Sequence, residues 1–469
     1  MVFNSLQYAV FLPAVLVIYW RLRHRRQNAL LLVASYAFYS AWDYRFCALM
    51  MLSTVVDYAV GRAMASTGDE RRRKLLFAAS LGVNLGVLGF FKYSNFFVDS
   101  AADLLMRLGL DADFPTLKIL LPIGISFYTF HGISYTFDVY RREIEPAGDL
   151  LSFAVFVAFF PQLVAGPIGR AHLQLPQFER PRTRPSSVQV RSAAFLILLG
   201  LFKKVVIADG LALYANQVFS GAGTRSGVDL LIGAYAFALQ IYGDFSGYSD
   251  IARGSSRLLG IELPENFAQP YLSRNITEFW RTWHISLSSW LRDYLYVSMG
   301  GNRGTRARVY RNLVLTMLIG GLWHGAAWTF VIWGGLHGLF LVVERARGVR
   351  SPRCPGPVAR GDAIRIFATF NLVCLAWVFF RAETLGQAIS YLAGIVTLRS
   401  GGVDNSAVVL VVLAGLAVLA VDIVQRNRNE DTAPMRWPAP ARGALYATLA
   451  AAIVLFSGGQ PVPFIYFQF

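Results

Sequence analysis

Apolar windows long enough to cross, or nearly cross, a lipid bilayer recur along almost the whole chain. They centre near residues 13, 35, 53, 83, 128, 158, 200, 236, 318, 334, 372, 414 and 450. Within a bilayer every backbone polar group must be satisfied internally, so windows of this length predict helices. With 55% hydrophobic and only 15% charged residues, the 469-residue chain is too apolar for a soluble protein. The sequence therefore predicts an all-α polytopic membrane protein.

The positive charge of the chain is concentrated in short loops between these windows. The formal net charge is +16, and loops such as 21–26 and 303–311 are rich in arginine. Basic loops of this kind mark the cytoplasmic side of a membrane protein. The positive charge therefore predicts which loops face the cytoplasm of the lipid membrane. It does not predict a nucleic-acid partner. The three cysteines, Cys47, Cys354 and Cys374, lie far apart in sequence and indicate neither a metal site nor a disulfide framework.

Two segments depart from the pattern of simple crossings. The window over 150–168 lies between two basic loops and ends in FFPQLVAGPIG, whose prolines and glycines break a helix. We predict a re-entrant or half-membrane element there; the alternative is a kinked crossing with one basic loop outside. Residues 262–300 interleave tryptophan and tyrosine with arginine, which predicts amphipathic helices at the headgroup level.

The stretch Gly320–Phe340, GGLWHGAAWTFVIWGGLHGLF, holds two histidines and no formal charge. In a single helix, His324 and His337 would point to opposite faces about 20 Å apart along the axis, too far to share a metal ion. Gly321 and Gly325 have the GxxxG spacing, which recurs later in the stretch and predicts close approach of a neighbouring helix. No metal site is expected.

Ionisable residues inside apolar segments are candidates for chemistry. Buried and neutral, His324 is suited to act as a general base; the alternative is a histidine that only bonds a neighbouring helix. His284, in FWRTWHISLSSW, is either its companion or an interfacial histidine. Asp209 and Asp244 end apolar runs and are candidates to orient a histidine or to bind substrate. The alternative for both is a structural ion pair with a lysine such as Lys204.

These residues lie in blocks that resemble one known family. The blocks are LPIGISFYTFHGISYTFDVYR, FPQLVAGPIGR, GLFKKVVIAD, YGDFSGYSDIARG, ENFAQPYLSRNITEFWRTWHISLSSWLRDYLY, GGLWHGAAWTFVIWGGLHG and LAWVFFRA, within about residues 120–381. They resemble the membrane-bound O-acyltransferases, in particular the bacterial polysaccharide branch that includes alginate O-acetyltransferases and, more distantly, teichoic-acid D-alanyl transferases. The resemblance extends to the amino terminus and to the tail FIYFQF.

The resemblance implies a single membrane domain over residues 1–469. It consists of a ring of about 11–13 membrane helices, with re-entrant and interfacial helices, around a central funnel. It makes His324 of the WHG motif catalytic, with His284 as companion. Beside them, Trp323 and Trp283 are candidates to contact substrate, and the Trp323 indole is a candidate donor to the oxyanion. It also implies a cytoplasmic thioester donor, acetyl-CoA or acyl carrier protein, and no bound cofactor.

The tail adds a candidate nucleophile. Positive-inside reasoning puts Tyr466 on the outer side, and the F-x-Y-F pattern of the teichoic-acid system implies a covalent acyl carrier there. The alternative is an aromatic belt that anchors the terminus at the interface.

Taken together, the sequence predicts an O-acetyltransferase of the bacterial inner membrane that serves an exported polysaccharide such as alginate. The resemblance implies a periplasmic acetyltransferase partner of the SGNH-like type. The alternative from another class is a transporter or flippase in which His324 relays protons.

Overall fold

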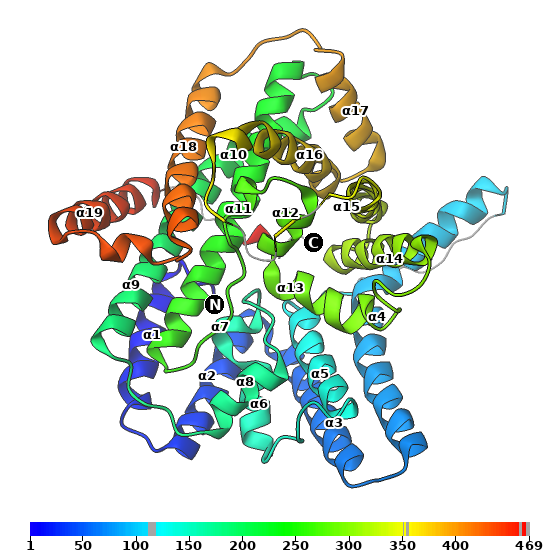
Figure 1. Cartoon of the computed structure of the whole chain (residues 1–469), viewed down its shortest axis with the longest axis vertical. Coiled ribbons are helices and arrows are strands. Elements are labelled where there is room, and N and C mark those ends of the chain that lie inside the picture. The colour runs from blue at the N-terminus through cyan, green and yellow to red at the C-terminus, as the bar shows by residue number, and fades with distance from the viewer. Residues whose placement is uncertain (111–118, 350, 353–355, 459–461, 466–469) are drawn as a thin grey trace. The chain divides into compact units, whose positions relative to one another are not determined.

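The computed structural model describes residues 1–110, 119–349, 351–352, 356–458 and 462–465, and all regular elements within these ranges are helical (Figure 1). The predicted all-α class is confirmed. The described residues group into two compact units. The first unit comprises Met1–Ser186 with Ser255–Pro264, and the second comprises Ser187–Gly254 with Glu265–Phe469. The single domain over 1–469 stays a prediction.

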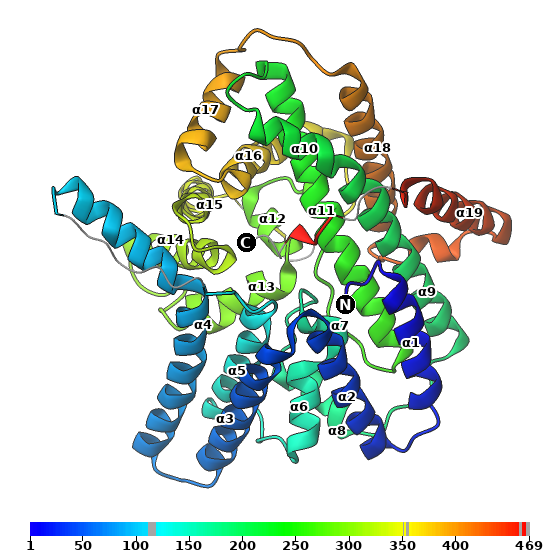
Figure 2. The ribbon, with the colours of Figure 1, turned by 180° about the vertical axis from the view of Figure 1, so that it is seen from behind.

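The first unit is built from eight labelled helices within its described residues. They are α1 (Leu6–Tyr19), α2 (His24–Asp43), α3 (Cys47–Ala65), α4 (Glu70–Arg107), α5 (Ile125–Tyr140), α6 (Leu150–Ala158), α7 (Phe160–Leu163) and α8 (Ala171–Glu179). Helices α3, α4 and α5 lie side by side in both views of the ribbon (Figures 1 and 2). Helix α4 alone has 38 residues, enough to cross a bilayer with length to spare.

The helix predicted to be broken near residues 150–168 is broken. Helix α6 has nine residues and ends where Phe159 leaves the helical conformation, with ψ 109°. The short helix α7 follows, and the chain is irregular before α8. Nine residues rise about 14 Å, roughly half of a hydrocarbon core. The length fits the predicted half-membrane element, whose placement in the bilayer stays a prediction.

Side chains of the first unit satisfy the backbone groups that this break releases. The Phe160 N–H donates to Ser35 Oγ at 3.0 Å, and the Gly169 N–H donates to His131 Nε2 at 3.0 Å. The Gln162 amide donates to the Phe156 carbonyl at 2.8 Å. Irregular backbone at membrane depth is tolerated where protein covers it in this way.

The second unit contains the other labelled helices. They are α9 (Ser187–Phe202), α10 (Gly210–Ser220), α11 (Gly227–Leu258, whose last turn belongs to the first unit), α12 (Ile276–Thr282), α13 (Ile285–Trp290), α14 (Arg306–His324), α15 (Trp328–Ala346), α16 (Ala363–Arg381), α17 (Leu385–Val396), α18 (Asn405–Arg428) and α19 (Ala439–Phe456). A π-helical turn over Lys203–Asp209 joins α9 to α10. The segment predicted to be interfacial, 262–300, forms the short helices α12 and α13 and a further π-helical turn. Its depth in the membrane stays a prediction.

Seven helical stretches of the described chain are long and apolar enough to cross a membrane. They are His24–Ala65, Glu70–Arg107, Gly227–Leu258, Trp328–Ala346, Arg360–Arg381, Asn405–Arg428 and Ala439–Phe456. Several predicted windows, such as those near residues 13 and 128, fall instead in helices of 14 and 16 residues. The ring of about 11–13 membrane helices stays a prediction.

Buried ion pairs tie the π-helical turn after α9 to α11 within the second unit. Lys203 Nζ lies 2.8 Å from Asp250 Oδ2, and Lys204 Nζ lies 2.9 Å from Asp244 Oδ1. Close to these pairs, Gly200 of α9 has no room for a Cβ atom, which would lie 2.6 Å from the Gly247 carbonyl oxygen of α11. Charged groups in such a tightly packed interior persist only when paired.

Candidate active site

The stretch Gly320–Phe340 is a helical hairpin and not the single helix that we predicted. Helix α14 ends at His324, the backbone of Gly325 is extended, and α15 begins at Trp328. Glycines at the predicted GxxxG spacing let the two helices meet closely: a Cβ on Gly321 would lie 2.3 Å from the Phe330 carbonyl oxygen. The hairpin places His324 at a turn.

The hairpin brings the two histidines to the same tryptophan ring. The prediction that they face opposite sides about 20 Å apart is wrong, because the chain reverses between them. Both rings pack against Trp333, with ring centroids 5.1 Å from His324 and 5.0 Å from His337. The Trp280 indole N–H donates to His337 Nδ1 at 3.3 Å. The distance between the histidines therefore no longer excludes a shared metal ion. The described residues nevertheless contain no group of three His, Cys, Asp or Glu side chains suited to hold one.

We expect the hairpin glycines to be essential for stability. In Gly321→Ala the new methyl group meets backbone atoms, which cannot move aside as a side chain can, and overpacking of this kind costs about 1–3 kcal/mol or more. The matched control is Gly335→Ala in α15, whose Cβ would lie 3.4 Å from a Leu318 methyl group, an ordinary contact. Thermal unfolding in detergent should show a lower midpoint for Gly321→Ala only. Equal midpoints would contradict the close-packed hairpin.

Aromatic rings surround His324, which is 4% exposed. The rings of Trp323, Trp333 and Phe380 lie edge-on to its imidazole at 4.9, 5.1 and 5.2 Å between centroids. The His284 ring lies 6.4 Å away. The structure thus brings together the two histidines that the sequence analysis singled out, although 40 residues separate them.

His284 lies between α12 and α13 and is held by an asparagine. Its backbone has φ 42°, a left-handed conformation that is unusual for a residue other than glycine. Its Nδ1 lies 3.1 Å from Asn266 Oδ1, an oxygen that also accepts the Ser286 backbone N–H at 3.3 Å. Because that oxygen can only accept, Nδ1 carries the proton and Nε2 is the acceptor nitrogen. Burial lowers the pKa of His284 to about 3, so the ring is neutral.

Asn266 is the site residue that the sequence analysis missed. It belongs to the block ENFAQPYL, and its amide also donates to Ser249 Oγ at 3.2 Å. The sequence offers no periodic signal that links it to a histidine 18 positions later, because the intervening chain folds back through α12.

We expect Asn266→Ala to impair activity by removing the group that fixes the His284 tautomer. Losing a buried hydrogen-bond partner costs about 1–3 kcal/mol, so turnover per folded protein should fall by about 10-fold to 100-fold. The control is Asn312→Ala, which removes a buried asparagine of α14 that bonds the carbonyl groups of Met299 and Gly301. If both variants lose activity in proportion to lost folded protein, the orienting role of Asn266 is wrong.

The two candidate tryptophans lie in different surroundings. The Trp323 ring contacts both histidines, with centroids 6.0 Å from His284 and 4.9 Å from His324. Trp283 is packed in an aromatic cluster, stacked on Phe279 and 5.0 Å from Trp377. Trp323 therefore contacts the histidine pair, whereas Trp283 contacts other aromatic rings, among them Phe279 and Trp377.

Asp209 and Asp244 both pair with Lys204. The Lys204 ammonium lies 2.8 Å from Asp209 Oδ1 and 2.9 Å from Asp244 Oδ1, as in the ion-pair alternative. It also donates to the Val462 carbonyl at 3.0 Å. Asp244 Oδ2 accepts the Ile465 backbone N–H at 2.6 Å. This charged cluster therefore holds the described tail segment, residues 462–465.

A chain of aromatic contacts leads from this tail segment to His284. Phe464 is 4% exposed and packs on Tyr248 and Phe245, with centroids 4.8 and 6.1 Å away. The Phe245 ring in turn packs edge-on to His284 at 4.6 Å. Tyr466 itself lies outside the described residues.

Comparison with known proteins identifies the family. Residues 129–381 match the family described as MBOAT, membrane-bound O-acyltransferase family. The probable alginate O-acetylase AlgI of Pseudomonas aeruginosa PAO1 is 46% identical over 391 residues, 83% of this chain and 73% of that protein. The peptidoglycan O-acetyltransferase of Helicobacter pylori 26695 is 38% identical over 419 residues, 83% and 78% of the two chains. The teichoic acid D-alanyltransferase of Bacillus subtilis 168 is 27% identical over 285 residues, 57% and 71% of the two chains.

The chain belongs to the membrane-bound O-acyltransferase family. It is a multi-pass membrane protein and an acyltransferase, which confirms the resemblance seen in the sequence.

Proposed function

We propose that this enzyme O-acetylates an exported polysaccharide, with acetyl groups taken from a cytoplasmic thioester at the inner membrane. Two relatives, a probable alginate O-acetylase and a peptidoglycan O-acetyltransferase, support the acetyl group and the class of acceptor. The donor is acetyl-CoA or an acetylated acyl carrier protein. A periplasmic partner of the SGNH-like type completes transfer to the polymer.

The observation that carries this proposal is the buried histidine pair beside the docked tail. His324 and His284 face one another across 6.4 Å, and the tail segment 462–465 reaches the same aromatic cluster through Phe245. The residue that follows, Tyr466, supplies the phenol oxygen as the nucleophile.

The first half-reaction acylates Tyr466. The His324 imidazole takes the phenol proton while the phenol oxygen attacks the thioester carbonyl, contributing about 100-fold to 10,000-fold as general base. The new C–O bond replaces the C–S bond, and the departing sulfur receives the proton from His324. The Trp323 indole N–H is the candidate donor to the oxyanion, a role worth about 3 kcal/mol.

The second half-reaction transfers the group outward. An acceptor hydroxyl attacks the tyrosyl ester, and its proton passes through His324 to the phenolate that leaves. His284 acts beside it as a neutral acceptor whose Nε2 can hold the hydroxyl in place.

Closed, right-side-out membrane vesicles from producing cells would test the proposal. Vesicles loaded with radiolabelled acetyl-CoA or acetyl-acyl carrier protein should place alkali-labile acetyl on external polysaccharide. Vesicles with His324→Ala should not. Intact labelled thioester outside the vesicles would instead indicate a transporter, and equal labelling by both kinds of vesicle would reject the proposed enzyme.

A further inference from the structure

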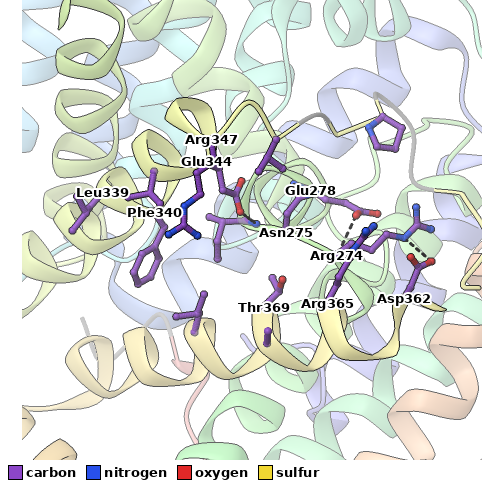
Figure 3. A pocket seen from close by; sticks show the side chains of 16 residues that line it. Arg274, Asn275, Glu278, Leu339, Phe340, Glu344, Arg347, Asp362, Arg365 and Thr369 are labelled. Atoms are coloured by element: carbon purple, nitrogen blue, oxygen red, sulfur yellow. Dashed lines mark hydrogen bonds and ion pairs between the residues drawn. The ribbon is translucent and has the colours of Figure 1, made fainter. Parts of the chain in front are cut away.

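A pocket of about 870 Å³ lies in the second unit, lined by α12, the second half of α15 and the first half of α16 (Figure 3). It does not include either histidine of the active site. One part of its wall is apolar and includes Leu339, Val343 and Leu372, all exposed on the described surface. The other part is polar. Its charged side chains are Arg274, Glu278, Glu344, Arg347, Asp362 and Arg365.

The three carboxylates of this pocket are already engaged. Glu344 accepts two backbone N–H groups at the start of α12, at 2.6 and 2.9 Å. Asp362 pairs with Arg274 at 3.1 Å, a pair that is visible at one end of the pocket in Figure 3. Glu278 pairs with the buried Arg426. None of the three is left to neutralise a further cation.

Two arginines remain for a ligand. Arg347 and Arg365 are exposed, and neither has an acidic partner among the residues that the structure describes. Guanidinium groups bind phosphate strongly, through charge-assisted hydrogen bonds. The pocket therefore presents free positive charge next to an apolar wall, which matches a ligand with a phosphate group and a hydrocarbon chain.

We propose that this pocket binds an anionic phospholipid such as phosphatidylglycerol. Its phosphate-bearing headgroup contacts Arg347 and Arg365, and an acyl chain runs along Leu339, Val343 and Leu372. The segment at the end of α15 is basic, with Arg345 and Arg347, and basic loops mark the cytoplasmic side. On that side, basic pockets between membrane helices take anionic headgroups. This lipid site does not depend on the proposed acetyl transfer.

Native mass spectrometry of the purified protein in detergent with added phosphatidylglycerol would test the site. Near a membrane surface each arginine contributes about fivefold to anionic lipid binding, so Arg347→Gln with Arg365→Gln should weaken retention by about 30-fold. The matched control carries Arg303→Gln and Arg308→Gln, two exposed arginines of the same unit, and should bind as the unchanged protein does. Phosphatidylcholine should be retained poorly by all three proteins.

Two results would overturn the lipid site. One is equal retention of phosphatidylglycerol by the double variant and the unchanged protein. The other is displacement of the lipid by CoA or inorganic phosphate, which would assign the arginines to a soluble phosphate ligand. His324→Ala should bind phosphatidylglycerol normally, so failure of acetyl transfer and failure of the lipid site are separate outcomes.

Discussion

His324→Ala should lower the turnover of acetyl transfer by about 100-fold to 10,000-fold while leaving the protein folded. The imidazole lies at the turn of the α14–α15 hairpin, buried among three aromatic rings and facing His284. Its neighbour His284 already uses Nδ1 in the contact with Asn266. Turnover of the labelled thioester per folded protein, in membranes of matched content, is the measurement.

His337→Gln is the matched control for this experiment. His337 is buried too and packs on the same Trp333 ring, and its Nδ1 accepts the Trp280 indole N–H. A glutamine amide oxygen can accept that bond, so this variant should retain most of its turnover. If His324→Ala were as active as His337→Gln, the general-base role would be wrong.

Tyr466→Phe should eliminate a protein-bound acetyl ester and lower turnover by at least about 1,000-fold, because the nucleophile is removed while the ring remains. After brief exposure to radiolabelled acetyl thioester, the unchanged protein should retain alkali-labile label. A variant with Cys47, Cys354 and Cys374 all replaced by alanine should retain it too.

Asp244→Ala tests the contacts that hold the tail segment separately from the nucleophile itself. It leaves the phenol in place but removes the acceptor of the Ile465 N–H and a partner of Lys204. Labelling should fall in this variant without disappearing. Full labelling of Tyr466→Phe would contradict the relay, and full labelling of Asp244→Ala would contradict the role of the charged cluster.

Periodicity and composition were sufficient for the fold class but not for the hairpin. Apolar windows predicted helices throughout, and the proline and glycine content of FFPQLVAGPIG predicted the break that occurs at Phe159. Gly320–Phe340 has no sequence feature that predicts a break, since Gly325, Ala326 and Ala327 are all compatible with an apolar helix. The hairpin brings Gly321 tightly against Phe330, a tertiary contact that periodicity cannot reveal.

The sequence identified most residues of the candidate site but not how they are arranged in space. His324 and His284 were identified from burial of ionisable groups and from the family blocks, and they do lie together. Asn266 was missed because its role depends on a left-handed backbone at His284 and on the path of α12. The pairing of Lys204 with both Asp209 and Asp244 was open in the sequence, because only the fold decides which carboxylates share one lysine.

The buried lysines after α9 have a consequence for biogenesis. Residues 187–220 contain Lys203 and Lys204 and are not among the seven stretches apolar enough to cross a membrane. Each lysine costs about 2.5–3.5 kcal/mol at the centre of a lone inserting helix. Lys204 has one partner within this segment, Asp209, but its second partner Asp244 and the Lys203 partner Asp250 lie on α11, which the ribosome makes later. We therefore expect stable insertion of α9 and α10 to depend on α11, so that the three segments enter the bilayer together.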